Sequence, residues 1–299
     1  MSDRLSLAYL KARGLVSQVT NEEGVDALLR ERGASMYVGF DPTATSLHLG
    51  HLLPVMVLAH LQHGGHRPIV LVGGATGMIG DPSGRNSERN LLPPETVQEN
   101  ARAVRRQLEQ FLDFGSGQSG AVMCDNAEWI GPLSFLDWLR DVGKHFTVNY
   151  MLAKESVRRR LEDRDSGISY TEFSYMLLQA YDFLHLYDTH GCRLQGGGND
   201  QWGNITAGIE LIRKVRAVEA MGITFPLVTT ASGEKFGKSA GNAIWLDAEQ
   251  TSPYRFYQYW MNVEDADVAN LLRLFTFLPL PEVDEIVREH RKGPERREA

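Results

Sequence analysis

Two histidines, His48 and His51, stand three residues apart with Gly50 between them in the segment HLGH. This spacing places both imidazoles on one face at the mouth of a predicted helix, Leu52–Leu61, where unpaired backbone N–H groups and the helix dipole attract anions. Gly50 lets a ligand approach the backbone closely, and Pro54 suits a first helical turn. The segment favours phosphate binding, although these residues alone leave open an exposed turn or a metal site.

A second candidate for phosphate binding is the loop GEKFGKS, in which Lys235 and Lys238 lie three residues apart beside Ser239. Two ammonium groups on a loop that contains glycine can form a mobile clamp for a polyphosphate. Taken alone, the same residues also fit a plain exposed loop.

A polar stripe follows one face of the predicted helix Tyr170–Tyr187. Tyr175, Gln179 and Asp182 share that face, and the other positions are mostly apolar. The segment contains no lysine or arginine, which a solvated face would normally carry. The stripe therefore predicts polar side chains that line an internal pocket; a thin surface stripe on a mostly buried helix is the alternative.

Two glycine-rich segments supply further polar side chains. GDPSG contains Asp81, and QGGGNDQ contains Gly198, Asp200 and Gln201. Each segment follows a predicted strand, and ligands bind at the carboxyl ends of the strands in an open α/β sheet. Either segment could by itself be a tight structural turn, but together with the other motifs they indicate one binding site.

Short apolar runs alternate with longer amphipathic segments, which indicates an α/β fold with a mainly parallel sheet and helices on both faces. The predicted strands are Met36–Phe40, Pro68–Val72, Val122–Cys124, Cys192–Gln195 and Pro226–Val228. Besides the two helices already named, helical patterns cover residues 1–33, Pro94–Phe114, Pro132–Val142, Ala153–Leu161, Asp200–Ala220 and the chain from Pro253 onward.

Composition excludes several classes of protein. The 299 residues are 42% hydrophobic with a net charge of −7, which is typical of a globular protein and disfavours a small basic nucleic-acid module. Cys124 and Cys192 form no CxxC pair, so no zinc knuckle or disulfide framework is expected. The N-terminus lacks an apolar targeting segment, and we expect a cytoplasmic protein.

His60, His63 and His66 surround a Gly-Gly turn and are expected to be solvated rather than metal-bound.

HLGH and KFGKS resemble the two signature motifs of the class I aminoacyl-tRNA synthetases. Further segments, spread over nearly the whole chain, are similar to bacterial tyrosyl-tRNA synthetases: YVGFDPTATSLHLGH, LVGGATGMIGDPSGR, DVGKHFTVNYMLAKESV, FSYMLLQAYDF and NDQWGNITAG. The resemblance implies a Rossmann-like catalytic domain at 34–247 with an insertion at about 125–190, between an N-terminal helical segment at 1–33 and the start of a helical domain at 248–299. It also implies tyrosine activation by ATP and transfer of tyrosine to the 3′ end of tRNA(Tyr).

The resemblance assigns roles to individual residues. The tyrosine-binding residues would be Tyr37, Asp81, Tyr175, Gln179, Asp182 and Gln201. Tyr37 and Asp182 would read the phenol, and phenylalanine would leave both unpaired. The ATP-binding residues would be Gly39, Asp41, His48, Gly50, His51, Gly198, Asp200, Lys235 and Lys238. The catalytic groups on the phosphates and the leaving pyrophosphate would be Thr43, His48, His51, Arg85, Arg89, Lys235, Lys238 and Ser239.

The same resemblance implies the partners. ATP is a substrate, and Mg²⁺ is expected to bind through its phosphates, without a protein metal site. A homodimer is expected, with the segment Phe135–Tyr170 at the interface, although basic residues there also suit tRNA. No membrane partner is expected.

Three other functions were weighed against this one. HxGH also occurs in smaller nucleotidyl transferases, tryptophanyl synthetases share the fold, and a synthetase-like RNA-binding or regulatory protein would lack activation. The phenol-reading pair and the intact motifs favour tyrosine activation. Nothing after Glu282 resembles a C-terminal RNA-binding domain, and the sequence ends in the charged stretch Arg288–Arg297. We therefore expect a catalytic core with weak or no charging of tRNA.

Overall fold

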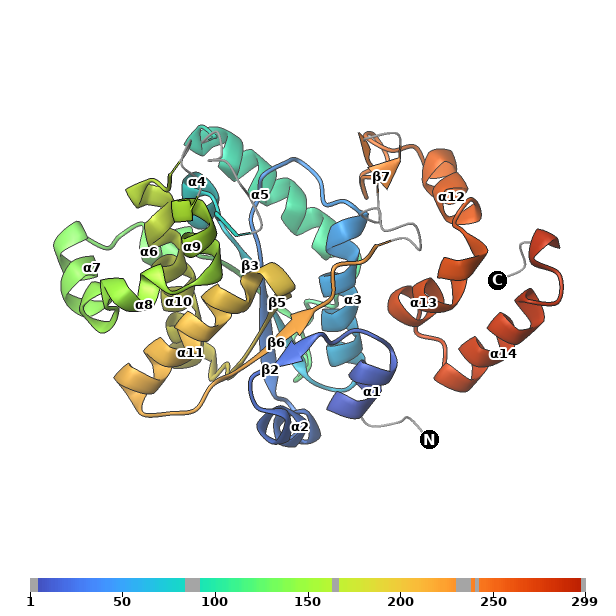
Figure 1. The fold of residues 1–299 in the computed structure, drawn as a ribbon, viewed down its shortest axis with the longest axis horizontal. Helices are drawn as coiled ribbons and strands as arrows, with labels where there is room; N and C mark the ends of the chain where they lie inside the picture. The colour runs from blue at the N-terminus through green and yellow to red at the C-terminus, as the bar shows by residue number, and fades with distance from the viewer. Residues whose placement is uncertain (1–4, 84–91, 163–166, 230–237, 240–241, 297–299) are drawn as a thin grey trace.

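A six-stranded sheet forms the centre of the computed structural model, which describes residues 5–83, 92–162, 167–229, 238–239 and 242–296 (Figure 1). The strand order is β1-β6-β5-β2-β3-β4, and all neighbouring strands are parallel except β1 against β6. The strands are β1 Gln18–Val19, β2 Ser35–Phe40, β3 Arg67–Val72, β4 Val122–Asp125, β5 Leu194–Gly198 and β6 Met221–Phe225. The predicted mainly parallel α/β sheet is confirmed.

Helices cover both faces of this sheet because side chains alternate along each strand. On β2, Met36, Val38 and Phe40 pack into one core, and Tyr37 packs into the other. The first core is closed by α1 Leu7–Ala12, α2 Glu22–Arg30, α3 Leu49–His63 and α5 Pro94–Leu108. The second core is closed mainly by α10 Tyr170–His190 and α11 Trp202–Arg216, with the short helix α4 Thr76–Ile79 beside α10.

Short helices fill the chain between β4 and β5, and they lie at the left of Figure 1. They are α6 Ala127–Ile130, α7 Phe135–Asp141, α8 Val148–Leu152 and α9 Glu155–Glu162. The long helix α10 follows, beginning where the Ser169 hydroxyl accepts the Glu172 N–H and ending at Gly191 with a left-handed φ of 63°. The Glu172 carboxylate pairs with the buried Arg160 at 3.0 Å, so it does not complete a capping box.

Two sequence predictions at the edge of the sheet were wrong. Pro226–Val228 is not a strand; β6 ends just before it, because proline has no N–H to donate to a ladder. Small or polar residues in β6, Gly222 and Thr224, hid its apolar pattern. Residues 1–33 are not helical throughout, since β1 interrupts them and pairs with β6.

The helices after the sheet form a separate group at the right of Figure 1. They are α12 Pro253–Met261, α13 Asp265–Phe275 and α14 Leu280–His290. Leu271 on α13 shares an apolar cluster with Leu49, Leu52 and Met56 on α3. In the described residues, no helix is both long and apolar enough to cross a membrane.

A buried arginine joins this group to the N-terminal helix. Arg13 is fully buried, and its guanidinium donates to the carbonyls of Arg273 at 2.9 Å, Leu278 at 2.9 Å and Thr276. It also donates to the Tyr9 hydroxyl at 3.0 Å. The three carbonyl acceptors lie at the end of α13 and just beyond it, where the helix dipole favours a cation. Arg13 therefore holds the connection between α13 and α14 against α1.

Candidate active site

The main cavity opens where the connections of the sheet change direction. From β2 the chain proceeds to β3 and β4 on one side, whereas β5 and β6 lie on the other. The connections that leave the carboxyl ends of β2 and β5 therefore turn in opposite directions. This leaves a crevice between the two strand ends in which a ligand can bind. A cavity of about 750 Å³ occupies this crevice, within the usual range of small-molecule sites.

Most of the predicted site residues line this one cavity. They are Tyr37, Gly39, Asp41, Thr43, His48, Gly50, His51, Asp81, Tyr175, Gln179, Asp182, Gly198, Asp200 and Gln201. Arg85, Arg89 and Lys235 lie outside the described residues. Lys238 and Ser239 form the short strand β7 Lys238–Ser239, which pairs with β8 Asn242–Ala243, and Ala243 lines the cavity.

The two histidines of HLGH form the beginning of α3. His48 is the N-cap residue, and its Nδ1 accepts the N–H of Gly50 at 3.0 Å. His51 Nδ1 accepts the N–H of His48 at 3.2 Å, and the two rings stack with centroids 3.9 Å apart. A neutral imidazole that accepts at Nδ1 carries its proton on Nε2. In this tautomer the Nε2–H of each ring is a hydrogen-bond donor.

This cap also corrects the predicted start of the helix. Because His48 caps it, α3 begins at Leu49 rather than Leu52, and Pro54 lies beyond the first turn. In the described part of the chain, no group of three or more His, Cys, Asp or Glu side chains is placed to hold a metal ion. His60 and His66 are buried rather than solvated, contrary to the expectation from the Gly-Gly turn.

Burial lowers the pKa of His51 to about 3, with a further contribution from the positive charge that His48 can carry. Between pH 6.5 and 3 the unfolded chain binds a proton at this position that the folded protein does not bind. Stability is therefore lost as the pH falls through this window, by up to about 1.4 kcal/mol per pH unit. We expect His51→Gln to lose less stability than the parent between pH 7 and 5 in urea unfolding. Parallel losses in both proteins would contradict this assignment.

One end of the cavity carries a buried carboxyl beside a buried phenol. Asp182 accepts from Asn126 Nδ2 at 3.0 Å and from Trp129 Nε1 at 2.8 Å. Burial raises the Asp182 pKa to about 8, although these two donors oppose the rise. The Tyr37 hydroxyl is buried and has no hydrogen-bond partner among the residues that the structure describes, and burial raises its pKa well above the usual 10, so it stays protonated. This end therefore offers a hydroxyl and a carboxyl to a polar ligand group.

Asn126 and Trp129 were missed by the sequence analysis. Asn126 is fully buried, donates to Thr76 Oγ1 at 3.0 Å and accepts the N–H of Ala75 at 2.8 Å. It follows β4 directly, so its place after a predicted parallel strand was the signal that could have found it. The indole of Trp129 had no such signal, because its contact depends on how α6 packs against α10.

Another part of the cavity, joined to Asp182 through Asn126 and Thr76, is a network of carboxyl, hydroxyl and amide groups. Tyr175 donates its hydroxyl to Asp41 Oδ2 at 2.9 Å, and Thr76 donates to Asp41 Oδ1 at 2.8 Å. Gln201 Nε2 donates to Asp81 Oδ2 at 2.7 Å. Asp41 and Asp81 give this part a negative charge that suits an ammonium group.

A third residue that the sequence analysis missed, Asn204, links two of the predicted site residues. Asn204 Nδ2 donates to Gln179 Oε1 at 3.0 Å and to Gln201 Oε1 at 3.2 Å. It is buried on α11, one turn after Gln201. Asn204 therefore fixes the orientation of both amides toward the cavity.

Comparisons with known proteins identify the family of this chain. The sequence model of the class I tRNA synthetases (W and Y) matches residues 29–299. The chain is 56% identical to tyrosine–tRNA ligase 2 of Enterococcus faecalis, over 97% of this chain and 68% of that protein. It is 57% identical to tyrosine–tRNA ligase of Geobacillus stearothermophilus, over 98% of this chain and 70% of that protein.

A solved structure gives the same result. A C-terminally truncated mitochondrial tyrosyl-tRNA synthetase of Aspergillus nidulans superposes with a TM-score of 0.88 at 32% identity, over 99% of this chain and 87% of that one. The matched sequences and the matched fold extend over nearly the whole chain. This chain therefore belongs to the class I tRNA synthetases, in their tyrosyl branch.

Proposed function

We propose that this chain is a tyrosine–tRNA ligase: it activates L-tyrosine with ATP to tyrosyl-adenylate, releases pyrophosphate, and transfers tyrosine to the 3′ end of tRNA(Tyr). The observation that carries the proposal is the set of polar groups that share one cavity. Tyr37 and Asp182 line it together with Asp41 and Asp81. A tyrosine bound there would find a hydroxyl and a carboxyl for its phenol and carboxyl groups for its ammonium.

The reaction needs positioning more than it needs a protein nucleophile. The tyrosine carboxylate attacks the α-phosphorus, a new P–O bond forms, and the bond to pyrophosphate breaks. The protein must align two anions and stabilise the charge that develops on the leaving group. The Nε2–H groups of His48 and His51 are the donors suited to that charge, and the lysines of KFGKS supply cations. Mg²⁺ bound through the ATP phosphates would neutralise part of the same charge.

Isotope exchange between pyrophosphate and ATP tests the proposal directly. The assay is run with each of the twenty amino acids in turn, and we expect exchange with tyrosine alone. Exchange with tryptophan would indicate a tryptophanyl-tRNA synthetase. No exchange with any amino acid would indicate a binding protein that does not activate amino acids.

Replacing His48 should slow formation of tyrosyl-adenylate more than it weakens tyrosine binding. Loss of one preorganised donor in a transition state costs roughly 100-fold in rate. His48→Ala also removes a helix cap, at a cost of about 1 kcal/mol in folding stability. The control is His48→Asn, which keeps a capping oxygen, so its stability should recover while its single-turnover rate stays low. An unchanged rate in both variants would refute the role of His48.

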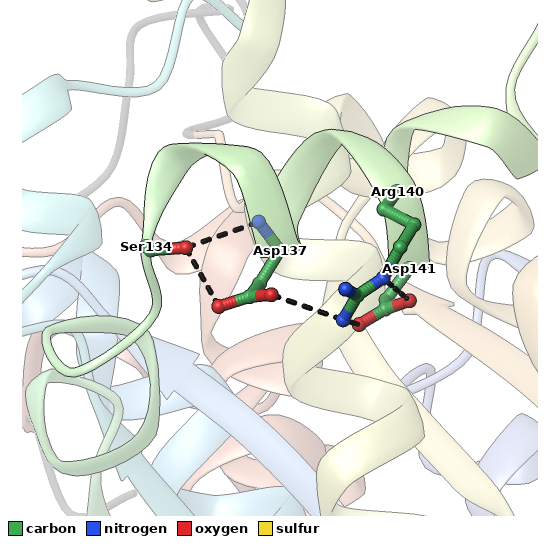
Figure 2. A network of polar contacts seen from close by, with 4 residues as sticks. All are labelled: Ser134, Asp137, Arg140 and Asp141. Carbon is green, nitrogen blue, oxygen red and sulfur yellow. Dashed lines mark hydrogen bonds and ion pairs between the residues drawn. The ribbon is translucent and has the colours of Figure 1, made fainter.

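We further propose that the chain forms a homodimer through the surface of α7 to α9. This surface exposes large apolar side chains: Phe135, Leu136, Leu139, Val148, Leu152 and Leu161. Ser134, Asp137, Arg140 and Asp141 form a polar network along α7, with Arg140 pairing with both carboxylates (Figure 2). Exposed apolar area with charged pairs beside it is typical of a protein–protein interface.

A single charge on this surface should separate the protomers. Leu136 is 76% exposed on α7, and we expect Leu136→Asp to sediment as a monomer while the parent sediments as a dimer. Tyr254 on α12 is 73% exposed outside this surface, so Tyr254→Asp serves as the matched control and should stay dimeric. A dimer that persists in Leu136→Asp would place the interface elsewhere.

Two basic residues of this segment are committed to contacts inside the protomer. Arg160 is buried against Glu172, and Lys154 donates to Thr206 Oγ1 at 2.8 Å. Burial lowers the pKa of Lys154 to about 8. The exposed Arg158 and Arg159 of α9 are therefore better candidates for a partner or for tRNA.

A further inference from the structure

A second cavity, of about 280 Å³, lies between α5 and the edge strand β4. None of its lining residues lines the main cavity. Its volume is close to the lower end of the range for small-molecule sites, roughly 300 Å³. Val72, Met78 and Met123 give it an apolar floor from β3, α4 and β4.

One wall of this cavity is basic. Arg102 and Arg105 of α5 line it together with Gln98 and Ala101, which share their helix face. Arg105 has one weak ion pair, to the exposed Glu109 at 3.8 Å, and Arg102 makes no ion pair with the residues that the structure describes. Two guanidinium groups beside an apolar floor suit a ligand that is apolar in its body and anionic at one end.

The opposite wall adjoins the carboxyl of the main cavity. Asp125 lines the second cavity, and its Oδ1 accepts the N–H groups of Gly74 at 3.1 Å and Ala127 at 2.9 Å. These two bonds partly satisfy its negative charge. The next residue, Asn126, donates to Asp182. An occupant of the second cavity would therefore contact the turn that holds the predicted reader of the phenol.

We propose that this second cavity binds a small organic anion with a compact apolar body, of the class of an aromatic carboxylate. The carboxylate would pair with Arg102 and Arg105, and the ring would cover Val72, Met78 and Met123. The site is independent of the ligase reaction, because none of its residues belongs to the machinery proposed above.

Cys124 makes occupancy of this cavity measurable. It lines the cavity and is partly exposed, whereas Cys192, the other cysteine, is fully buried. Burial raises the pKa of Cys124 to about 11, with Glu128 adding to the rise and Arg105 opposing it, so its alkylation is slow enough to follow. Iodoacetamide is neutral and is not steered by the arginines; the thiolate forms a C–S bond with it and iodide leaves.

The experiment measures alkylation of Cys124 by iodoacetamide, with tyrosine present at saturation to occupy the main cavity. Benzoate is the probe, and benzamidine is the control of the same shape and opposite charge. At four times its Kd, benzoate should slow alkylation about fivefold, whereas benzamidine should not slow it. Protection by both compounds, or by neither, would overturn the proposal.

Two variants locate the anion and the label. The double variant Arg102→Gln, Arg105→Gln should be alkylated at a rate that benzoate no longer changes, and protection that persists in it would also overturn the proposal. Cys124→Ser should not be alkylated by iodoacetamide under the same conditions. This control checks that Cys192 does not contribute to the measured alkylation. Pyrophosphate exchange with tyrosine, measured on the same double variant, should equal that of the parent. If the double variant loses pyrophosphate exchange as well as protection by benzoate, these arginines take part in the ligase reaction. That result would overturn the independence of the site.

Discussion

Asp182→Ala is expected to weaken tyrosine binding by about 2–3 kcal/mol, or roughly 30- to 150-fold, because the phenol loses its hydrogen bond to the Asp182 carboxyl in a buried site. ATP binding should change little, because Asp182 is not among the residues expected to bind ATP. The preference for tyrosine over phenylalanine should fall as well, since phenylalanine never made the lost contact. Calorimetry with tyrosine, phenylalanine and ATP measures all three effects.

The control for this variant must separate binding from folding. Asp182→Ala leaves the Trp129 indole N–H unpaired and takes one acceptor from the Asn126 amide, which keeps Thr76 Oγ1, at about 1–3 kcal/mol of folding stability for each lost bond. Asp182→Asn keeps the shape and one acceptor, so its folding loss should be smaller while its tyrosine affinity still falls. Unchanged tyrosine affinity in a folded Asp182→Ala protein would remove Asp182 from the site.

Arg13→Met is expected to lower the free energy of unfolding by about 3–5 kcal/mol. The substitution keeps an apolar stem but leaves the carbonyls of Arg273, Thr276 and Leu278 without their donor, and bonds to a charged donor are worth about 1.5–3 kcal/mol each. Urea unfolding followed by circular dichroism measures the loss. Limited proteolysis should also cut faster between α13 and α14, because this connection is no longer held.

Two substitutions calibrate that result. Arg193 is exposed and pairs with Glu31 at 3.2 Å, so Arg193→Met should cost less than about 1 kcal/mol. Arg13→Lys keeps the charge but cannot reach all of the acceptors at once, and its loss should lie between the other two. If Arg13→Met and Arg193→Met lower the free energy of unfolding equally, the buried contacts of Arg13 stabilise the fold no more than an exposed ion pair does.

The sequence predicted the architecture and the composition of the cavity better than the contacts within it. Apolar runs such as Met36–Phe40 identify buried strands, and the positions that follow parallel strands converge because of topology alone. Asp182 could be placed on a polar stripe, but its partners could not be predicted. Asn126 and Trp129 reach it across 56 and 53 residues of sequence, and no local pattern encodes such a contact.

The failures have the same physical cause. The strand β6 contains Gly222 and Thr224, so its burial comes from packing of α11 and pairing with β5 rather than from an apolar pattern. No local pattern signals the burial of Arg13, because carbonyl groups from residues 273–278 surround it. Where tertiary contacts override local preference, a single sequence gives no signal.

The position of Arg13 also has a consequence for the order of events during synthesis. Its backbone acceptors lie 260 to 265 residues later in the chain, and β1 pairs with β6 through residues that are 204 to 206 apart. Contacts between such distant residues close the largest loops and tend to form last. The N-terminal helix α1 is therefore synthesised early, but its contacts form late. On the ribosome, the Arg13 guanidinium stays in water until residues 273–278 have emerged. A growing chain would acquire its cavity before it acquires this final contact.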